Sequence, residues 1–277
     1  MTVADSRKVS VVITTFNEEA FIRDALESML EQTLSDFEIV VVDDGSEDST
    51  REILAEYEDY ERIRIFYSEH VGRSGALNTA IDEARGEYIA VVDPDDISAE
   101  NRLEAQAAYL DDHPNVGIVG SAYVAENEIR SESYIREYPT EDDAIRRAMA
   151  KYIPIPHSSM MARREALIQA GLYDGTREAI VDLDLMIRVA VNWKLANLTE
   201  PLITRSIRED SSFHSMFSST RRHFKLFGLH LKAVRLLELP RHYYLYALGH
   251  LLYHFFPTPV KKQVRRLFAD FTESETK

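Results

Sequence analysis

Three carboxylates occupy four consecutive positions of this sequence, directly after a short apolar run. The run is Tyr88 to Val92, and the acids are Asp93, Asp95 and Asp96. A short β-branched run without alternation is typical of a strand buried on both faces, and open α/β sheets bind ligands at the carboxyl ends of such strands. Carboxylates this close repel one another unless a cation neutralises them, so they predict a divalent metal that carries a diphosphate. The alternative is a solvated acidic turn followed by a helix cap.

Strands and helices alternate through the N-terminal part of the chain, which predicts βαβ units and a largely parallel sheet. The expected strands are 8–17, 37–42, 62–67 and 88–92, and the expected helices are 18–30, 50–58 and 76–84, the last after a glycine turn at 72–75. Polar and acidic residues follow three strands, at 14–18, 43–44 and 93–96. Since parallel strands end at one edge of a sheet, these loops are expected to converge on one site.

The later part of the chain also mixes both element types. We expect helices at 101–110 and 142–150, strands at 116–124 and 193–198, and a helix beginning near Ile180. The polar segment 126–143 is expected to be a loop or a partly ordered excursion. Pro154 and Pro156 favour an extended backbone, which the segment 158–161 would continue as a strand. The G-x-G-x-x-G fingerprint after the first strand and the P-loop lysine motif are both absent, so the nucleotide sites that use them are excluded.

Composition narrows the function further. The chain has 277 residues, is 45% hydrophobic, contains no cysteine and has a net charge of −15. An acidic body argues against nucleic-acid binding, and the lack of cysteine excludes disulfides and thiolate metal sites. The polar N-terminus and the lack of a long apolar run predict no signal peptide and no membrane span, and hence a cytoplasmic protein.

Four segments resemble the inverting family-two glycosyltransferases, which have the GT-A fold. They are VVITTFN (11–17), VVDDGSEDST (41–50), GEYIAVVDPDD (86–96) and DLDL (182–185), and the resemblance covers roughly residues 8 to 210 in the family's order. It implies an α/β fold in which a mostly parallel sheet is flanked by helices, and transfer of a sugar from a nucleotide diphosphate donor to a glycan acceptor. A non-catalytic sugar-nucleotide-binding module and a sugar nucleotidyltransferase are the alternatives.

The resemblance also assigns residues to the nucleotide donor, with UDP favoured. Thr14 and Phe16 fall where the family contacts the base, and Phe16 keeps the stacking face of the usual tyrosine without its hydroxyl. The remaining nucleotide-site candidates are Asn17, Glu18, Asp44, Arg73 and Asp93. Asp44 would accept from a uracil-type ring nitrogen, and Asp93 would contact the ribose.

The metal and the catalytic base are implied in the same way. Asp95 would bind Mg²⁺ or Mn²⁺, while Asp96 would support it or cap a helix near Ala99. Asp182 matches the general base, although Val181 stands where the family usually has glutamate. Asp182 as a simple helix cap is the alternative. A zinc site is not favoured, because the histidines lack ligand spacing.

The acceptor side has fewer candidates. His157 and Ser158 match a segment that lines the acceptor side in the family, and Asp184 is a third acceptor-side candidate. The alternative for His157 and Ser158 is a proline-stiffened strand with a surface histidine. Arg208 falls in a loop where a guanidinium could bind the diphosphate.

The C-terminal tail differs from the rest of the chain. From Thr220 onward it has eleven Lys or Arg and four Asp or Glu, interleaved with aromatic and aliphatic residues at helical spacing. A basic, apolar helix at 255–268 predicts peripheral attachment to the cytoplasmic face of the cell membrane, and with it a lipid-linked acceptor. The alternative is a helical cap packed on the domain. The predicted organisation is a glycosyltransferase domain at 1–215, with a nucleotide-binding half at 8–100 and an acceptor half at 101–215, followed by a helical tail at 216–277.

Overall fold

The computed structural model describes residues 7–177, 179–208 and 220–256. Its N-terminal part alternates strands and helices as the hydrophobic pattern predicts. The elements are β1 (Arg7–Thr15), α1 (Ile22–Leu30), β2 (Phe37–Asp43), α2 (Thr50–Ala55), β3 (Ile63–Tyr67), α3 (Arg73–Glu83), β4 (Gly86–Val92), β5 (Asp96–Ser98) and α4 (Arg102–Asp112).

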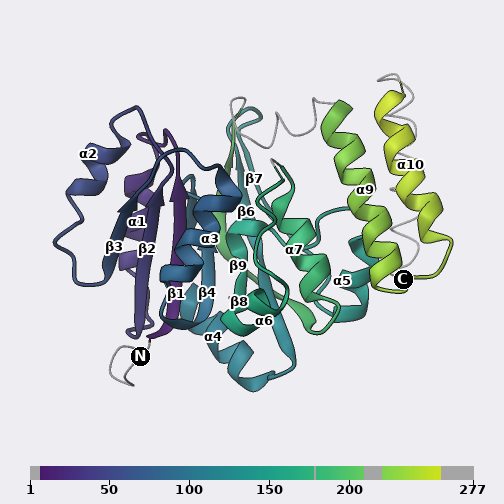
Figure 1. Cartoon of the computed structure of the whole chain (residues 1–277), viewed down its shortest axis with the longest axis horizontal. Helices are drawn as coiled ribbons and strands as arrows, with labels where there is room; N and C mark the ends of the chain where they lie inside the picture. Colours follow the sequence, from purple (N-terminus) through teal and green to yellow (C-terminus); the bar gives the residue numbers. More distant parts are fainter. Residues whose placement is uncertain (1–6, 178, 209–219, 257–277) are drawn as a thin grey trace.

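The C-terminal part is less regular and ends in two helices that lie side by side at the far end of the molecule from β3 (Figure 1). Its elements are β6 (Val116–Asn127), β7 (Glu132–Arg136), α5 (Asp142–Ala148), the 3-10 helix η2 (His157–Ser159), β8 (Met161–Arg163), α6 (Arg164–Gln169), α7 (Val181–Val189), β9 (Lys194–Ile207), α9 (Thr220–Leu236) and α10 (Tyr243–Phe255).

One sheet joins the two parts. Its strand order is β3-β2-β1-β4-β8-β6-β9-β5, and β7 pairs with β6 outside this path. The first four strands are parallel, as expected from the βαβ pattern. Beyond β4 the sheet is mixed, because β8 runs antiparallel to β4 and β6 while β6 and β9 are parallel.

Helices cover both faces of the sheet. Because strand side chains alternate, Val11 and Ile13 of β1 join the core under α1 and α4, while Val12 joins the core under α3, α6 and α7. Both faces of the central strands are therefore buried, which explains their unbroken apolar runs. The polar residues that follow these runs are left at the sheet's carboxyl edge.

The helix α9 is part of the domain core. Leu229 and Ala233 are buried in the same cluster as α7. The buried His230 donates its Nδ1–H to the carbonyl oxygen of Met149 at 3.0 Å, and burial lowers the pKa of this imidazole to about 4, with the nearby His250 adding to the effect. The expectation of a helical cap packed on the domain therefore describes α9.

The apolar basic helix expected at 255–268 lies almost entirely outside the described residues. Among the helices that the structure describes, none combines the length and the apolar composition that a crossing of the bilayer requires.

Three local predictions need correction. The segment 126–143, expected to be a loop or a partly ordered excursion, contains the strand β7, which pairs with β6. All five residues of β7 are exposed, so no buried alternation marked the strand in the sequence. His157 to Ser159 form a short 3-10 helix, and the strand begins only at Met161. The turn expected at 72–75 is confined to Gly72 (φ 81°), after which α3 begins.

Candidate active site

A first cavity of about 440 Å³ lies at the carboxyl ends of β1, β2 and β4. Its walls come from the loops in which the sequence places its nucleotide and metal candidates. Every one of those candidates lines it: Thr14, Phe16, Asn17, Glu18, Asp44, Arg73, Asp93 and Asp95. The structure thus brings together residues from four separate loops, as the parallel βαβ arrangement predicts.

Two of these loops are tied to each other by Asn17. This residue adopts a left-handed backbone conformation (φ 57°), which asparagine tolerates better than most side chains. Its backbone N–H donates to the Ser46 hydroxyl at 2.9 Å, and its side-chain oxygen accepts from the backbone N–H of Glu47 at 2.8 Å. These bonds hold the loop after β1 against the loop after β2.

Asp44 holds the loop between β3 and α3. Its carboxylate is buried and accepts the backbone N–H groups of Val71, at 2.7 Å, and of Gly72, at 3.0 Å. The same loop supplies His70, whose ring lies 4.5 Å from that of Phe16, centroid to centroid. Phe16 and His70 together form an aromatic wall of the first cavity.

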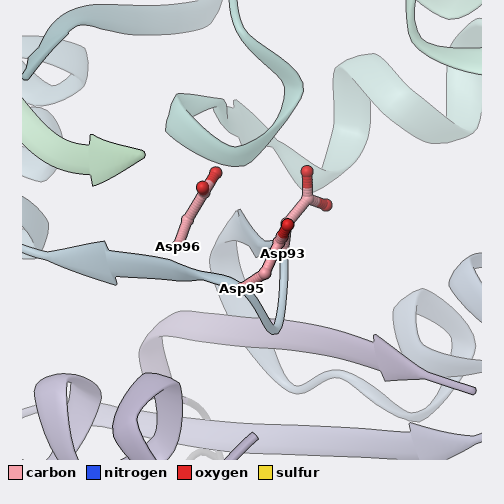
Figure 2. Close-up of side chains that lie close together, drawn as sticks. All are labelled: Asp93, Asp95 and Asp96. Carbon is pink, nitrogen blue, oxygen red and sulfur yellow. The ribbon is translucent and has the colours of Figure 1, made fainter. Parts of the chain in front are cut away.

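The acid turn between β4 and β5 places three carboxylates close together (Figure 2). Oxygens of Asp93, Asp95 and Asp96 lie within 4.8 Å of one another, and the side chains of Asp93 and Asp96 rise on the same side of the turn. Their partners differ. Asp93 is paired with the Arg73 guanidinium, and the buried Asp96 is paired with Arg205 at 3.2 Å.

Asp95 is the least engaged of the three. Its one ion pair within the described part of the chain is a long one, 3.7 Å, to Arg208. The Arg208 guanidinium also lies 3.8 Å from the ring centroid of Phe21 and lines the first cavity, where the sequence predicted it. Asp95 is therefore the carboxylate with most capacity to take a further ligand.

The electrostatics of the first cavity favour a cation. Burial raises the pKa of Glu18 to about 7, and the charges of Asp95 and Asp93 add to this rise. Burial, followed by the charge of Asp93, also raises the pKa of Asp95. Burial of Asp93 is again the largest effect and opposes its ionisation, but Arg73, His157 and Arg205 together outweigh it and hold the pKa of this carboxyl well below its usual range.

The donor set fits Mg²⁺ or Mn²⁺. It consists of carboxylate oxygens alone, which these hard cations prefer, and contains no nitrogen or sulfur ligand typical of zinc. Asp95 would hold the metal, with Asp93 beside it. Asp96 is not a helix cap, which corrects one expectation: it lies in β5, and α4 begins only at Arg102.

A second cavity of about 550 Å³ adjoins the first and shares Arg73 and Asp93 with it. Asp182, the predicted base, lines this second cavity together with Val181 and His157. The base candidate and the metal candidate therefore lie in different cavities that meet at one pair of side chains.

Backbone strain marks the start of the helix that carries Asp182. Ile180, which immediately precedes α7, has φ 58° and ψ 42°. A β-branched residue in this left-handed region is an outlier that costs about 1–3 kcal/mol and persists only where its surroundings enforce it. The cost is consistent with a functional demand on the position of Asp182, the second residue of α7.

A hydrogen-bond chain crosses the boundary between the cavities. Arg73 Nη2 lies 3.0 Å from His157 Nδ1, and His157 Nε2 lies 2.7 Å from the Tyr173 hydroxyl. Since a guanidinium can only donate, Nδ1 accepts and Nε2 carries the hydrogen. Burial also raises the pKa of Tyr173 beyond its usual range. His157 is thus a buried residue that orients Arg73, which differs from the surface histidine considered as an alternative.

Two acceptor candidates lie elsewhere. Ser158 is fully buried and lines neither cavity. Asp184 is buried among cations, at 2.8 Å from Arg188, 2.7 Å from Lys232 and 3.1 Å from Arg177. Burial opposes its ionisation, but Lys232 and Arg188 outweigh this and lower its pKa. Asp184 thus joins α7 to α9, and the geometry gives it no contact with an acceptor.

Several functional residues had no signal in the sequence. Arg102 is fully buried and donates to the Val91 carbonyl at 2.8 Å and to the Ser98 hydroxyl at 2.9 Å, which fixes β4 two residues before Asp93. Burial lowers the pKa of Arg102 to about 10. From sequence alone, an isolated arginine is expected to lie on the surface. Only the structure shows that Arg102 is buried and bonded to β4.

The tail helices also contribute to the site. Arg222 and Leu226 of α9 and His250 of α10 line the second cavity. The predicted division into a catalytic domain and a separate tail did not anticipate this contact.

Comparison with known proteins identifies the family of this chain. The family model described as "Glycosyl transferase family 2" matches residues 10–171. The putative glycosyltransferase EpsE of Bacillus subtilis is 30% identical over 267 residues, which cover 94% of this chain and 93% of that protein. The chain belongs to glycosyltransferase family 2. Its matched segment contains the four loops named above as lining the first cavity, and the alternatives of a nucleotidyltransferase and a non-catalytic module are set aside.

Solved structures confirm the fold of this family-two member. Staphylococcus aureus TarS 1-349, in complex with UDP-GlcNAc, has a TM-score of 0.69 at 22% identity and covers 90% of this chain and 72% of its own. The mannosyltransferase PcManGT from Pyrobaculum calidifontis, in complex with GDP-Man and Mn²⁺, has a TM-score of 0.66 at 19% identity and covers 95% and 80%. The predicted GT-A fold is therefore confirmed, with helices at the C-terminus.

Proposed function

We propose that this glycosyltransferase moves a sugar from a nucleotide diphosphate donor, UDP in preference to GDP, to a glycan hydroxyl, with inversion at the anomeric carbon. The observation that carries the proposal is the pair of cavities joined at Arg73 and Asp93, with the candidate metal ligands in one and Asp182 in the other. That arrangement provides opposite sides for a leaving diphosphate and an attacking hydroxyl.

The first cavity would hold the nucleotide. The Phe16 and His70 rings offer a stacking surface for the base, and Asp44 retains lone pairs to accept from a ring nitrogen beside its two backbone bonds. A metal bound at Asp95 supplies charge neutralisation for the diphosphate as it leaves. Arg73 and Arg208 would bind the same phosphates from the protein side.

The second cavity would hold the acceptor. The Asp182 carboxylate takes the proton of the acceptor hydroxyl while that oxygen forms a bond to the anomeric carbon. The bond from this carbon to the diphosphate oxygen breaks, and its electron pair leaves with the nucleotide. A single displacement of this kind inverts the configuration.

Donor binding gives the direct test. We expect UDP with Mn²⁺ to raise the melting temperature. At a hundredfold excess of UDP over its Kd, binding should add about 2.7 kcal/mol to the free energy of unfolding. UDP with EDTA should give a small shift, and GDP with Mn²⁺ a smaller one than UDP. The proposal fails if none of these nucleotides stabilises the protein, and the preference for UDP fails if GDP gives the larger shift. Transfer from the best UDP-sugar should then give a product of inverted configuration by NMR.

We further propose that the acceptor is carried by a lipid and that α10 rests on the membrane surface. Leu245, Leu248, Leu252 and Phe255 recur every three or four residues and form an exposed stripe, while Ala247 and Leu251 face inward. The Phe224 ring of α9 extends the stripe, 6.3 Å from that of Phe255. Basic residues at the start of α9 (Arg221 and Lys225) suit anionic lipids.

Flotation with vesicles of equal parts phosphatidylglycerol and phosphatidylcholine tests this attachment. The double variant Leu245→Ser and Leu252→Ser should lose most of the bound fraction, because it removes two exposed side chains from the stripe. Ile168→Ser, which changes a residue on α6 about as exposed as Leu252, is the control. Unchanged flotation of the double variant would remove α10 as the contact.

A further inference from the structure

The second cavity is unusual in its charge. The chain as a whole has a net charge of −15. Yet this cavity is lined by four arginines and two acids, namely Arg73, Arg136, Arg205, Arg222, Asp93 and Asp182. Two of the arginines are neutralised, since Arg73 pairs with Asp93 and Arg205 pairs with the buried Asp96. Among the other arginines of the lining, Arg136 is the one whose surroundings decide what this cavity can bind.

Arg136 is presented by the β7 hairpin. It lies directly opposite Tyr123 in the ladder between β6 and β7, and Tyr134 lies two residues before it. Residues opposite each other, and residues two apart, share one face of a sheet, so these three side chains face the same cavity. Within the described residues Arg136 forms no ion pair; its guanidinium lies 5.8 Å from the Tyr138 ring centroid.

Tyrosines form much of the remaining wall. The cavity is lined by Tyr123, Tyr134, Tyr138 and Tyr152, and Tyr134 and Tyr152 are each about 40% exposed. An aromatic ring with a hydroxyl stacks on the apolar face of a sugar and bonds to its polar rim. Rings of this kind beside an unpaired guanidinium suit a sugar that carries an anion.

We propose that the acceptor of this enzyme bears a negative charge, a carboxylate or a phosphate, next to the sugar that receives the transfer, and that Arg136 binds this anion. The inference rests on the proposed function, because it assigns the second cavity to the acceptor. It adds the chemical class of the acceptor, and it gives the β7 hairpin a role in specificity.

The test compares charged and neutral sugars with the protein saturated by UDP and Mn²⁺, so that anions cannot enter the first cavity. NMR titration gives the Kd of phenyl β-D-glucuronide against phenyl β-D-glucoside, and of α-D-glucosyl phosphate against methyl α-D-glucoside. We expect the charged member of at least one pair to bind about fivefold more tightly, the size of a partly exposed ion pair. The pair that shows the preference identifies the anion as carboxylate or phosphate.

Matched variants assign the preference to one side chain. Arg136→Gln should abolish it and Arg136→Lys should keep part of it. Arg130→Gln, in the same hairpin but outside the cavity and paired with Glu132 at 3.5 Å, should leave it unchanged. Because β7 is an exposed strand, the urea midpoint of each variant should match that of the parent. Equal affinity for charged and neutral sugars, or a preference that survives Arg136→Gln, overturns the inference. Loss of the UDP and Mn²⁺ thermal shift in the parent protein would instead contradict the proposed function.

Discussion

Asp182→Asn is expected to lower the rate of sugar transfer by about 10²–10⁴-fold, the contribution typical of a general base. The amide cannot take the proton of the acceptor hydroxyl, yet its size and shape are nearly those of the carboxylate. Asp182 lines the second cavity and not the first, so the UDP and Mn²⁺ thermal shift should be unchanged. Single-turnover transfer from the best donor measures the rate of the chemical step, and melting curves with and without UDP and Mn²⁺ measure the thermal shift.

Asp184→Asn is the matched control for this variant, one half-turn along the same helix. Its carboxylate faces Arg188, Lys232 and Arg177, so removing the charge should lower the urea midpoint and leave the chemical step largely intact. A wild-type rate in Asp182→Asn would exclude Asp182 as the base. An equal loss of rate in both variants would indicate disturbance of α7 and not loss of a base.

Asp95→Asn is expected to abolish the part of the UDP thermal shift that depends on Mn²⁺. The neutral amide is a poorer ligand for a hard cation than a carboxylate, and Asp95 is the acid with the weakest competing ion pair. The rate of sugar transfer should also fall, because without the metal the leaving diphosphate loses its main source of charge neutralisation. Titration of Mn²⁺ into the protein with UDP present measures the change.

Asp96→Asn separates metal binding from packing at the same turn. Asp96 is buried against Arg205, so its loss should destabilise the fold by about 3–5 kcal/mol while the folded protein still responds to Mn²⁺. If Asp96→Asn loses the Mn²⁺ response and Asp95→Asn keeps it, the roles of the two acids are reversed.

The three acids of the turn thus have different environments despite their adjacency. Sequence alone offers three similar carboxylates, and the resemblance to a family divides them between ribose, metal and support. The structure adds a physical difference between them. Arg73 pairs with Asp93 and Arg205 pairs with Asp96, while the ion pair of Asp95 within the described residues is a long one, to Arg208.

The sequence by itself determined the strand-end loops and their convergence, because unbroken apolar runs predict buried parallel strands and parallel strands end together. It also determined the family, through the motifs in those loops. Only the tertiary structure decided the pairing of Arg205 with Asp96, the chain from Arg73 through His157 to Tyr173, and the position of Asp184 among cations. These contacts join residues distant in sequence, and no local pattern records them.

The acceptor side depended on tertiary structure more than the donor side did. The strand β7 has no buried face, so its sequence lacks the alternation that marks a strand, and backbone pairing with β6 creates it. The tail was predicted as an appendage because its charge differs from that of the body. Packing of α9 on α7 instead makes Arg222 a wall of the second cavity.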